Sequence, residues 1–301
     1  MNEVLVTGLS GMVGSRFKAL YGQEYQLTNL DLTQGVDITR PDQVEAAVKQ
    51  SQAKALIHLA AYTNVKAAFE QQDDKNGPCY QVNVVGSQNV AAACQKYGKY
   101  LIHISTDFVF DGNQETAYTE SDSPQPIEWY GQTKHWSELA VQERVERWVI
   151  LRLAYPYQVK PVRPDFLALM IEKIKSGTLP PQFTDHIITP TGVDDIAAIF
   201  KICLEKQPPG IYHAVGSSWH SDYDLALRVQ ETFGLSGEIK AGSLAEYQKT
   251  TARPYQKQLK MSNAKLKQEL GYQPKTFTEG LSAIAGLTAA PLGDLGMVAG
   301  Q

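Results

Sequence analysis

Three evenly spaced glycines near the start of the chain constrain its fold more than any other feature. In the segment VTGLSGMVGSRF, Gly8, Gly11 and Gly14 follow a short apolar run and precede a helical pattern. Glycines at such positions allow a tight turn, close approach of the backbone to a pyrophosphate and close helix packing. The first N–H groups of the helix, around Met12 and Val13, attract phosphate through the helix dipole. The segment predicts a dinucleotide-binding turn, with a glycine-rich turn that binds nothing as the alternative.

The rest of the chain alternates strand and helix patterns. Short apolar runs predict strands at 3–8, 25–31, 54–60, 99–105, 147–153 and 210–215. Helical patterns occur near 12–21, 41–50, 79–97, 165–176, 192–206, 221–234, 243–249 and 262–270. Repeated βα units form a parallel sheet with helices on both faces. We therefore predict an α/β fold, a doubly wound, Rossmann-like parallel sheet, in which ligands bind beyond the carboxyl ends of the strands.

The regular alternation of strand and helix patterns ends after the fifth predicted strand, where proline and aromatic residues become frequent. We interpret residues 1–153 as a dinucleotide-binding domain, to which 192–220 return. Residues 154–191 and 221–286 are expected to form a smaller C-terminal substrate lobe. Residues 287–301 have little periodicity and are expected to form a frayed tail.

Composition excludes several classes of function. The net charge is -4 and Lys and Arg form no run, which argues against a nucleic-acid or anionic-membrane partner. No apolar stretch approaches the roughly 20 residues of a membrane span, and the first residues resemble a strand rather than a signal peptide, so a cytoplasmic location is expected. The three cysteines lack CxxC spacing, which indicates neither a disulfide framework nor a zinc site.

Polar and small residues at the ends of the second and third predicted strands suit a dinucleotide. Asp31 is placed to accept hydrogen bonds from the adenosine ribose, and a carboxylate there would repel a 2′-phosphate. No arginine lies near that strand end, so NADH is favoured over NADPH. Arg16 on the first helix could reverse this preference, and NADPH stays open. For Asp31, a solvated strand-end acid is the alternative.

Further candidate cofactor residues follow the same strands. Asp37 and Ile38 are expected at the edge of the adenine. Small residues that leave room for the diphosphate and ribose follow the third strand, at Ala60, Ala61 and Tyr62. Asn83, a polar residue in an apolar helix pattern, is expected to brace the end of the fourth strand and is counted with the cofactor residues.

Hydroxyl groups at the fourth strand and a tyrosine–lysine pair predict catalysis. Ser105 and Thr106 end that strand, and Tyr130 and Lys134 share one face of a helix at i and i+4. A free tyrosine has a pKa of ~10, which a nearby ammonium is expected to lower. Hydride transfer to a carbonyl needs such a proton donor, and Thr106 could bind the same oxygen. Lys134 could also hold the nicotinamide ribose; a plain surface pair is the alternative.

In combination, these motifs resemble the extended short-chain dehydrogenase/reductase family. The segments STDFVFDG, YGQTK, GIYHAVG and ARPYQKQL are, more narrowly, similar to dTDP-4-dehydrorhamnose reductase and its relatives, over roughly residues 1–286. The resemblance implies a triad of Thr106, Tyr130 and Lys134 and a C-terminal lobe that receives a nucleotide sugar. Arg152 and Tyr155 fall where relatives carry an arginine and a tryptophan, the latter near the hexose.

The chain departs from these relatives at two places. Relatives with bound magnesium carry a glutamate near position 16, where this chain has Arg16, so no metal site is predicted. After the Arg-Pro pair, relatives show a small polar run that ends in arginine. Here the run is YQKQ, which leaves Arg253 and Lys257 as the candidate cations for a substrate diphosphate.

The resemblance implies NAD(P)H-dependent reduction of a nucleotide-linked 4-keto-6-deoxy sugar, with a proton from Tyr130. A 4-epimerase has a similar triad and stays open, as does a non-catalytic NAD(P)-binding subunit such as the regulatory subunit of methionine adenosyltransferase. A 4,6-dehydratase usually carries Asp-Glu after the threonine, whereas Asp107 and Phe108 follow here, which counts against elimination. The sugar, the nucleotide and the oligomeric state are left open, a homodimer included.

Overall fold

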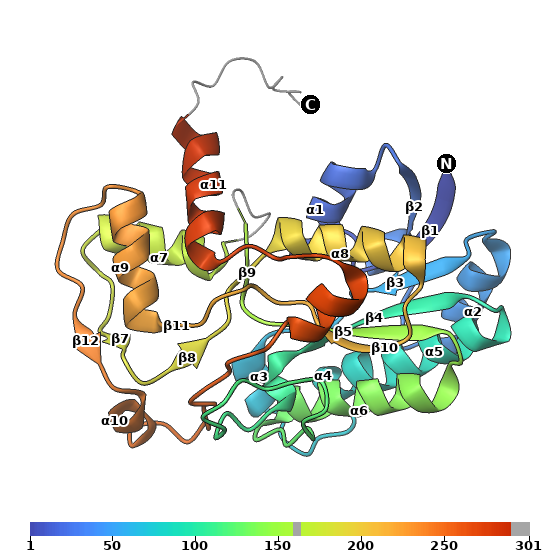
Figure 1. Cartoon of the computed structure of the whole chain (residues 1–301). Coiled ribbons are helices and arrows are strands. Elements are labelled where there is room, and N and C mark those ends of the chain that lie inside the picture. The colour runs from blue at the N-terminus through green and yellow to red at the C-terminus, as the bar shows by residue number, and fades with distance from the viewer. Residues whose placement is uncertain (159–163, 290–301) are drawn as a thin grey trace, which may run out of the picture.

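The chain forms a six-stranded parallel sheet covered by helices on both faces (Figure 1). The structure is a computed structural model and describes residues 1–158 and 164–289. The strand order is β10-β5-β4-β3-β1-β2, and every neighbouring pair in it is parallel. The strands are β1 (Asn2–Thr7), β2 (Tyr25–Asn29), β3 (Ala55–His58), β4 (Tyr100–Thr106), β5 (Trp148–Leu153) and β10 (Gly210–His213). The predicted doubly wound α/β fold is confirmed.

The strands of this sheet form where the sequence has short, largely apolar runs. All four residues of β3 are buried, because helices cover both of its faces. The six strands begin and end within two residues of the predicted bounds. The agreement follows from the continuous hydrophobic runs that a doubly covered strand requires.

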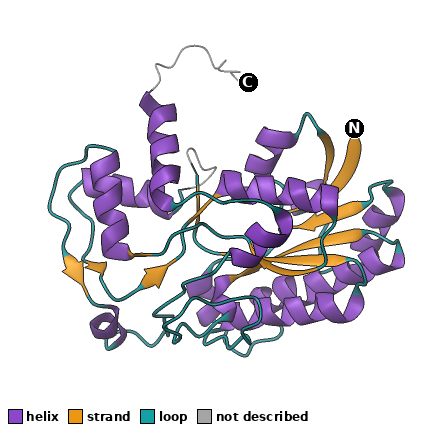
Figure 2. Ribbon diagram, in the orientation of Figure 1, coloured by secondary structure: helices purple, strands orange, loops and turns teal. Residues whose placement is uncertain are grey.

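Helices α1 and α8 pack together on one face of the sheet, and α2, α5 and α6 lie on the other (Figure 2). Their bounds are α1 (Met12–Tyr21), α2 (Pro41–Gln50), α5 (Ser87–Lys96), α6 (Trp129–Arg144) and α8 (Val193–Lys206). On the first face Phe17 of α1 packs edge-on against Phe200 of α8 with a centroid distance of 5.8 Å. On the second face Val48 and Val141 belong to one buried apolar cluster with Leu101 of the sheet. Each face therefore has its own core.

The helix predicted near 79–97 contains a wider turn. A short α4 (Pro78–Tyr80) passes into a π-helical segment, Gln81–Gly86, before α5 begins. Short α3 (Val65–Phe69) precedes it. π-Helical turns inside α-helices are frequent at functional sites. This one contains Asn83, whose contacts are described below.

A smaller region forms around three helices that pack beside the sheet domain. These are α7 (Phe166–Lys175), α9 (Asp222–Thr232) and α11 (Phe277–Ala289), whose apolar faces share one buried cluster. Short strands pair around them: β6 (Pro156–Tyr157) with β9 (Thr191–Gly192), β7 (Gln182–Phe183) with β12 (Ala241–Gly242), and β8 (Ile187–Ile188) with β11 (His220–Ser221). Helix α10 (Leu244–Gln248) completes the region.

The sequence patterns do not predict α11. Its glycines lower helix propensity, but Gly280 lies against the Tyr157 hydroxyl, where a Cβ atom would collide. Packing therefore outweighs propensity. The helix runs three residues into the predicted tail, to Ala289, and 290–301 lie outside the described residues. The division into a cofactor domain and a substrate lobe remains our proposal.

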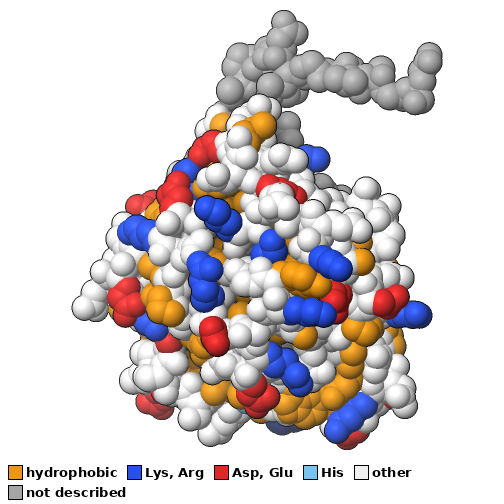
Figure 3. Space-filling view, turned by 90° about the vertical axis from the view of Figure 1, so that its right-hand side faces the viewer, with side chains coloured by type: hydrophobic (Ala, Val, Ile, Leu, Met, Phe, Trp, Pro, Cys, Tyr) orange, Lys and Arg blue, Asp and Glu red, His pale blue; other side chains and the backbone are white. Residues whose placement is uncertain are grey.

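Charges of both signs are mixed on the surface. Figure 3 shows Lys and Arg side chains interspersed with Asp and Glu over one face, without a field of a single sign. Among residues 1–158 and 164–289, no helix combines the length and the apolar character needed to cross a membrane. In the same part of the chain, no group of three or more His, Cys, Asp or Glu side chains is arranged to hold a metal ion.

Candidate active site

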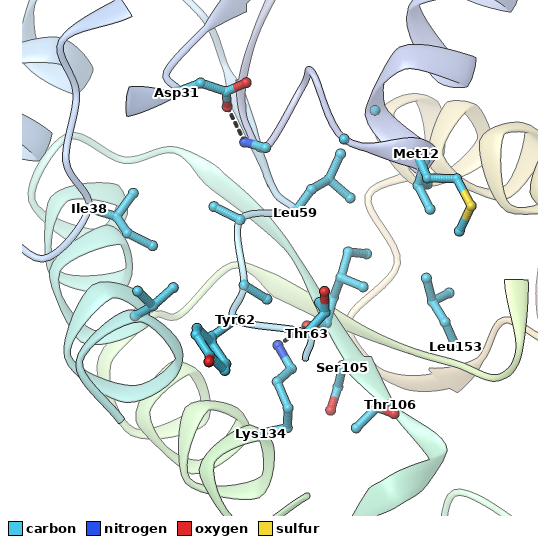
Figure 4. A pocket seen from close by; sticks show the side chains of 18 of the residues that line it. Met12, Asp31, Ile38, Leu59, Tyr62, Thr63, Ser105, Thr106, Lys134 and Leu153 are labelled. Atoms are coloured by element: carbon cyan, nitrogen blue, oxygen red, sulfur yellow. Dashed lines mark hydrogen bonds between the residues drawn. The ribbon is translucent and has the colours of Figure 1, made fainter. Parts of the chain in front are cut away.

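A cavity of about 950 Å³ lies at the carboxyl ends of the parallel strands (Figure 4). It is lined by the turn after β1, the segments that follow β2 to β5, and the start of α6. Most predicted site residues line it: Gly8, Gly11, Met12, Val13, Gly14, Asp31, Asp37, Ile38, Ala60, Ala61, Tyr62, Ser105, Thr106, Tyr130, Lys134 and Tyr155. Asn83, Arg253 and Lys257 are not among the lining residues.

The glycine turn packs too tightly for side chains. Gly8 has a left-handed backbone (φ +72), and a Cβ atom there would lie 2.7 Å from the Ala60 nitrogen. A Cβ on Gly14 would lie 2.6 Å from the carbonyl oxygens of Gly8 and Leu9. Gly11 is the N-cap of α1 and supplies no side-chain cap, so the first N–H groups of the helix are available to an anion. The turn thus has the features that dinucleotide binding requires.

Asp31 has partners that the sequence does not predict. Its Oδ1 accepts hydrogen bonds from the backbone N–H groups of Gly8 and, at 3.1 Å, Leu9. Its Oδ2 accepts from the Ser10 N–H at 2.9 Å and the Ser10 hydroxyl at 2.6 Å. The carboxylate therefore anchors the glycine turn to the end of β2. A contact with the adenosine ribose stays a prediction.

Arg16, the residue that could favour NADPH, is already paired. Its Nε and Nη2 donate to the two carboxylate oxygens of Asp194 at 2.6 and 2.8 Å, which joins α1 to α8. Among the described residues that line the cavity, Lys134 is the one lysine or arginine. A 2′-phosphate beside Asp31 would therefore meet a carboxylate and no lining cation.

Asn83 braces a different segment from the predicted one. Its Oδ1 accepts from the Tyr62 N–H at 2.8 Å, and its Nδ2 donates to the Tyr62 carbonyl at 3.2 Å and the Thr133 hydroxyl at 3.0 Å. The prediction that it braces the end of the fourth strand is wrong. Asn83 instead ties the segment after β3 to α6, and it acts on the cavity through Tyr62.

The start of α6 is held rigidly. Glu128 is its N-cap, and the carboxylate accepts from the N–H groups of Tyr130 at 3.1 Å and Gly131 at 2.7 Å. A side chain on Gly131 would collide with the Phe108 carbonyl, so the helix can approach the end of β4 only with glycine there. These contacts bring Tyr130 and Thr106 to the same end of the cavity.

Burial controls the charges of the tyrosine–lysine pair. Lys134 Nζ donates to the Ile104 carbonyl at 2.6 Å, and burial lowers the pKa of Lys134 to about 8. Burial raises the pKa of Tyr130 above its ordinary value, and Thr106 acts in the opposite direction. The predicted lowering of this pKa by Lys134 is therefore wrong, because desolvation of the phenolate dominates.

In the sequence, Asp107 counts only against elimination, but in the structure it lines the cavity. Its Oδ1 accepts from the Thr106 hydroxyl at 3.0 Å, whereas Oδ2 is buried and has no hydrogen-bond partner in the described structure. Burial raises the pKa of Asp107 to about 7, against the effect of the Thr106 hydrogen bond. Its position directly after β4 was the available signal.

The residues expected around the substrate divide into two groups. Tyr155 lines the cavity, but Arg152 is buried outside it and pairs with Glu138 through hydrogen bonds of 2.9 and 2.8 Å. Arg253 is half-buried and stacks over the Tyr255 ring at 4.4 Å. Lys257 is exposed. Neither cation lines the cavity, so a diphosphate role for them stays a prediction.

Comparisons with known proteins agree on the family. The family model described as the RmlD substrate binding domain matches residues 1–288. The chain is 28% identical to a dTDP-4-dehydrorhamnose reductase from Aggregatibacter actinomycetemcomitans, over 94% of this chain and 98% of that protein. It is also 28% identical to subunit beta of methionine adenosyltransferase 2 from Rattus norvegicus, over 77% and 72% of the two chains. A crystal structure of dTDP-4-dehydrorhamnose reductase from Bacillus anthracis in complex with NADP has a TM-score of 0.86 and 28% identity, and the match covers 94% of this chain and 99% of that one.

Proposed function

Because the chain belongs to the RmlD substrate binding domain family, we propose that it reduces a nucleotide-linked 4-keto-6-deoxy sugar with NADH or NADPH. The chain is an oxidoreductase of the extended short-chain dehydrogenase/reductase type, and its proposed reaction is that named for its reductase relatives. One observation carries the proposal: Thr106, Tyr130 and Lys134 line the same cavity as the glycine turn. This arrangement supports a role for Tyr130 as the proton donor beside a nicotinamide.

The residues present fit a nicotinamide cofactor. The uncapped start of α1 suits its diphosphate, and when bound the cofactor supplies the hydride. The Tyr130 hydroxyl is protonated at neutral pH with or without the rise in its pKa, and it can donate to the developing alkoxide, which is a stronger base. Thr106 binds the same oxygen, and Lys134 holds the nicotinamide ribose.

The sugar occupies the end of the cavity that Asp107 and Tyr155 line. The unpartnered Oδ2 of Asp107 accepts a hydrogen bond from a sugar hydroxyl, which satisfies a buried acceptor. The ring of Tyr155 packs against the hexose. Arg253 and Lys257 bind the diphosphate from the substrate lobe.

One assay distinguishes the proposed reductase from its two rivals. The regulatory-subunit alternative is favoured by the similarity to methionine adenosyltransferase 2 subunit beta. Such a protein would bind NAD(P) without turnover, and a 4-epimerase would return its hydride to the sugar. Net oxidation of NADH or NADPH on addition of a dTDP-linked 4-keto-6-deoxy sugar supports the reductase and contradicts both rivals.

We expect the wild type to bind NADH more tightly than NADPH, because Asp31 repels a 2′-phosphate that no lining cation receives. Asp31→Ala should reduce the difference in affinity between NADH and NADPH. It should also weaken the binding of both cofactors, because the glycine turn loses its anchor. Fluorescence titration of both cofactors measures the effect. Asp42→Ala, at an exposed site on α2, is the control. Tighter binding of NADPH by the wild type would contradict the proposed preference.

We expect Arg253→Ala to raise the KM for the nucleotide sugar more than Lys257→Ala does. Arg253 is half-buried beside Tyr255, and its charge acts on Tyr155, whereas Lys257 is exposed and screened by salt. Contacts present in ground and transition states alike change KM rather than kcat. Steady-state kinetics with both substrates measures the effect, with Arg228→Ala as control. If both variants keep the wild-type KM and melting temperature, the diphosphate binds elsewhere.

A further inference from the structure

A histidine–carboxylate pair lies behind the sugar end of the cavity. Nδ1 of His186 lies 2.8 Å from Oδ2 of Asp222, and the two side chains are 10% and 21% exposed. His186 directly precedes β8, and Asp222 is the first residue of α9. Antiparallel pairing of β8 with β11, which leads into α9, holds the two residues together. The pair therefore has a fixed position in the smaller region.

The imidazole of His186 packs against the tyrosine that forms the cavity wall. The ring centroids of His186 and Tyr155 are 6.2 Å apart at 67°, and Phe183 packs edge-on against the imidazole at 6.4 Å. Tyr155 has a left-handed backbone (φ 39), which is rare for a residue with a side chain. Such conformations persist where the surroundings over-determine them, often at ligand sites. His186 is part of these surroundings.

Charged groups from several elements face this position. Asp222 of α9 is paired with His186, and Asp107, at the end of β4, is close enough for the charge of His186 to lower its pKa against the effect of burial. Arg253 and Tyr255 act electrostatically on the neighbouring Tyr155. The imidazole thus contacts the carboxylate that orients it and the Tyr155 ring, and it acts electrostatically on Asp107 of the cavity.

We propose that His186, oriented by Asp222, is a positioning residue for the sugar, which holds the Tyr155 ring in place beside Asp107 at the sugar end of the cavity. The inference rests on the proposed function, because Asp107 and Tyr155 are the residues through which it acts. The buried Oδ2 of Asp107, which has no hydrogen-bond partner in the described structure, accepts the hydrogen bond from a sugar hydroxyl.

The same region contains a matched control. His220 is hydrogen-bonded to the carboxylate of Asp224 and, at 2.9 Å, to the hydroxyl of Ser218. Its ring packs on Phe277 at 5.7 Å, in the apolar cluster of α7, α9 and α11. Neither His220 nor Asp224 lines the cavity. His220→Gln therefore measures how much the loss of a histidine–carboxylate pair lowers the stability of the fold, without a change in the binding of the sugar.

The test compares His186→Gln, Asp222→Asn and His220→Gln. For His186→Gln we expect a rise of about tenfold in the KM for the keto sugar, the equivalent of one modest polar contact, with the KM for NADH unchanged. The acid limb of the kcat/KM profile should move to higher pH, because Asp107 becomes protonated more readily. Asp222→Asn should act in the same direction, and His220→Gln should leave both quantities as in the wild type.

A double-variant cycle decides whether His186 acts through Asp107. In the Asp107→Asn background, His186→Gln should no longer shift the acid limb, because the group it influences is gone. If His186→Gln lowers only the melting temperature and keeps the wild-type pH profile and KM, the inference is overturned while the reductase stands. A wild type that does not reduce any keto sugar overturns the proposed function, and the inference with it.

Discussion

Replacement of Tyr130 by phenylalanine is expected to lower kcat for the keto sugar by about 10²–10⁴-fold, the usual contribution of a positioned proton donor. The phenol lies in the cavity at the start of α6, where Glu128 caps the backbone of the helix and Phe108 packs against the tyrosine ring. The substitution removes only the hydroxyl oxygen and leaves the packing of the ring against Phe108 intact. The fold and cofactor affinity should therefore be retained, which thermal melting and NADH titration measure.

Tyr80→Phe is the matched control for this variant. Tyr80 packs against Trp129 in the same aromatic cluster, but it does not line the cavity. Its hydroxyl should be dispensable for turnover. Wild-type kcat in Tyr130→Phe would remove Tyr130 from the mechanism, and loss of folding would show that its hydroxyl is structural.

The residues of the candidate site were predictable because they follow strands. In a parallel sheet the carboxyl ends of all strands meet at one edge, so Gly8, Thr106 and Tyr62 lie at one cavity although they are distant in sequence. Tyr130 and Lys134 were predictable because the i, i+4 spacing places both on one face of α6. Strand bounds were equally accessible, because a doubly covered strand has to be apolar throughout.

Contacts between distant segments could not be predicted in the same way. The sequence indicates that Asp31 ends a strand, but not that the glycine turn folds back onto both of its oxygens. The polar character of Asn83 is visible, whereas its pairing with Tyr62 depends on the π-helical turn. His186 has no distinguishing local pattern. Its proposed role follows from its contacts with Tyr155 and Asp222, which only the tertiary structure brings together.

Loss of the buried ion pair between Arg152 and Glu138 is expected to lower the stability of the fold strongly. The pair joins β5 to α6, the helix that carries Tyr130 and Lys134, and both side chains are 1% exposed. The guanidinium binds both oxygens of the carboxylate and lies 5.0 Å from the centroid of the Phe110 ring. The family resemblance puts Arg152 where relatives carry an arginine; in the structure Arg152 belongs to this pair and does not line the cavity.

Arg152→Met should lower the free energy of unfolding by about 3–5 kcal/mol, because it leaves a buried carboxylate without its partner. Arg152→Met combined with Glu138→Leu should recover much of this loss, because neither charge is then left unpaired. Urea denaturation at pH 7 measures both. The half-exposed pair of Arg16 and Asp194 offers the control, since the same change at Arg16 should cost about 1 kcal/mol or less. An equal cost at the two sites would contradict the prediction.

The pH dependence of this cost provides an independent check. Although burial opposes ionisation, the hydrogen bonds from Arg152 lower the pKa of Glu138 from 4.5 to about 2. A carboxyl group whose pKa is lower in the folded protein contributes stability that is complete above its unfolded pKa and is lost as the pH falls toward the folded one. The wild type should therefore lose this contribution between pH 4.5 and about 2. In the double variant that part of the acid-induced loss should be absent, because no carboxyl group remains at position 138 to bind the proton.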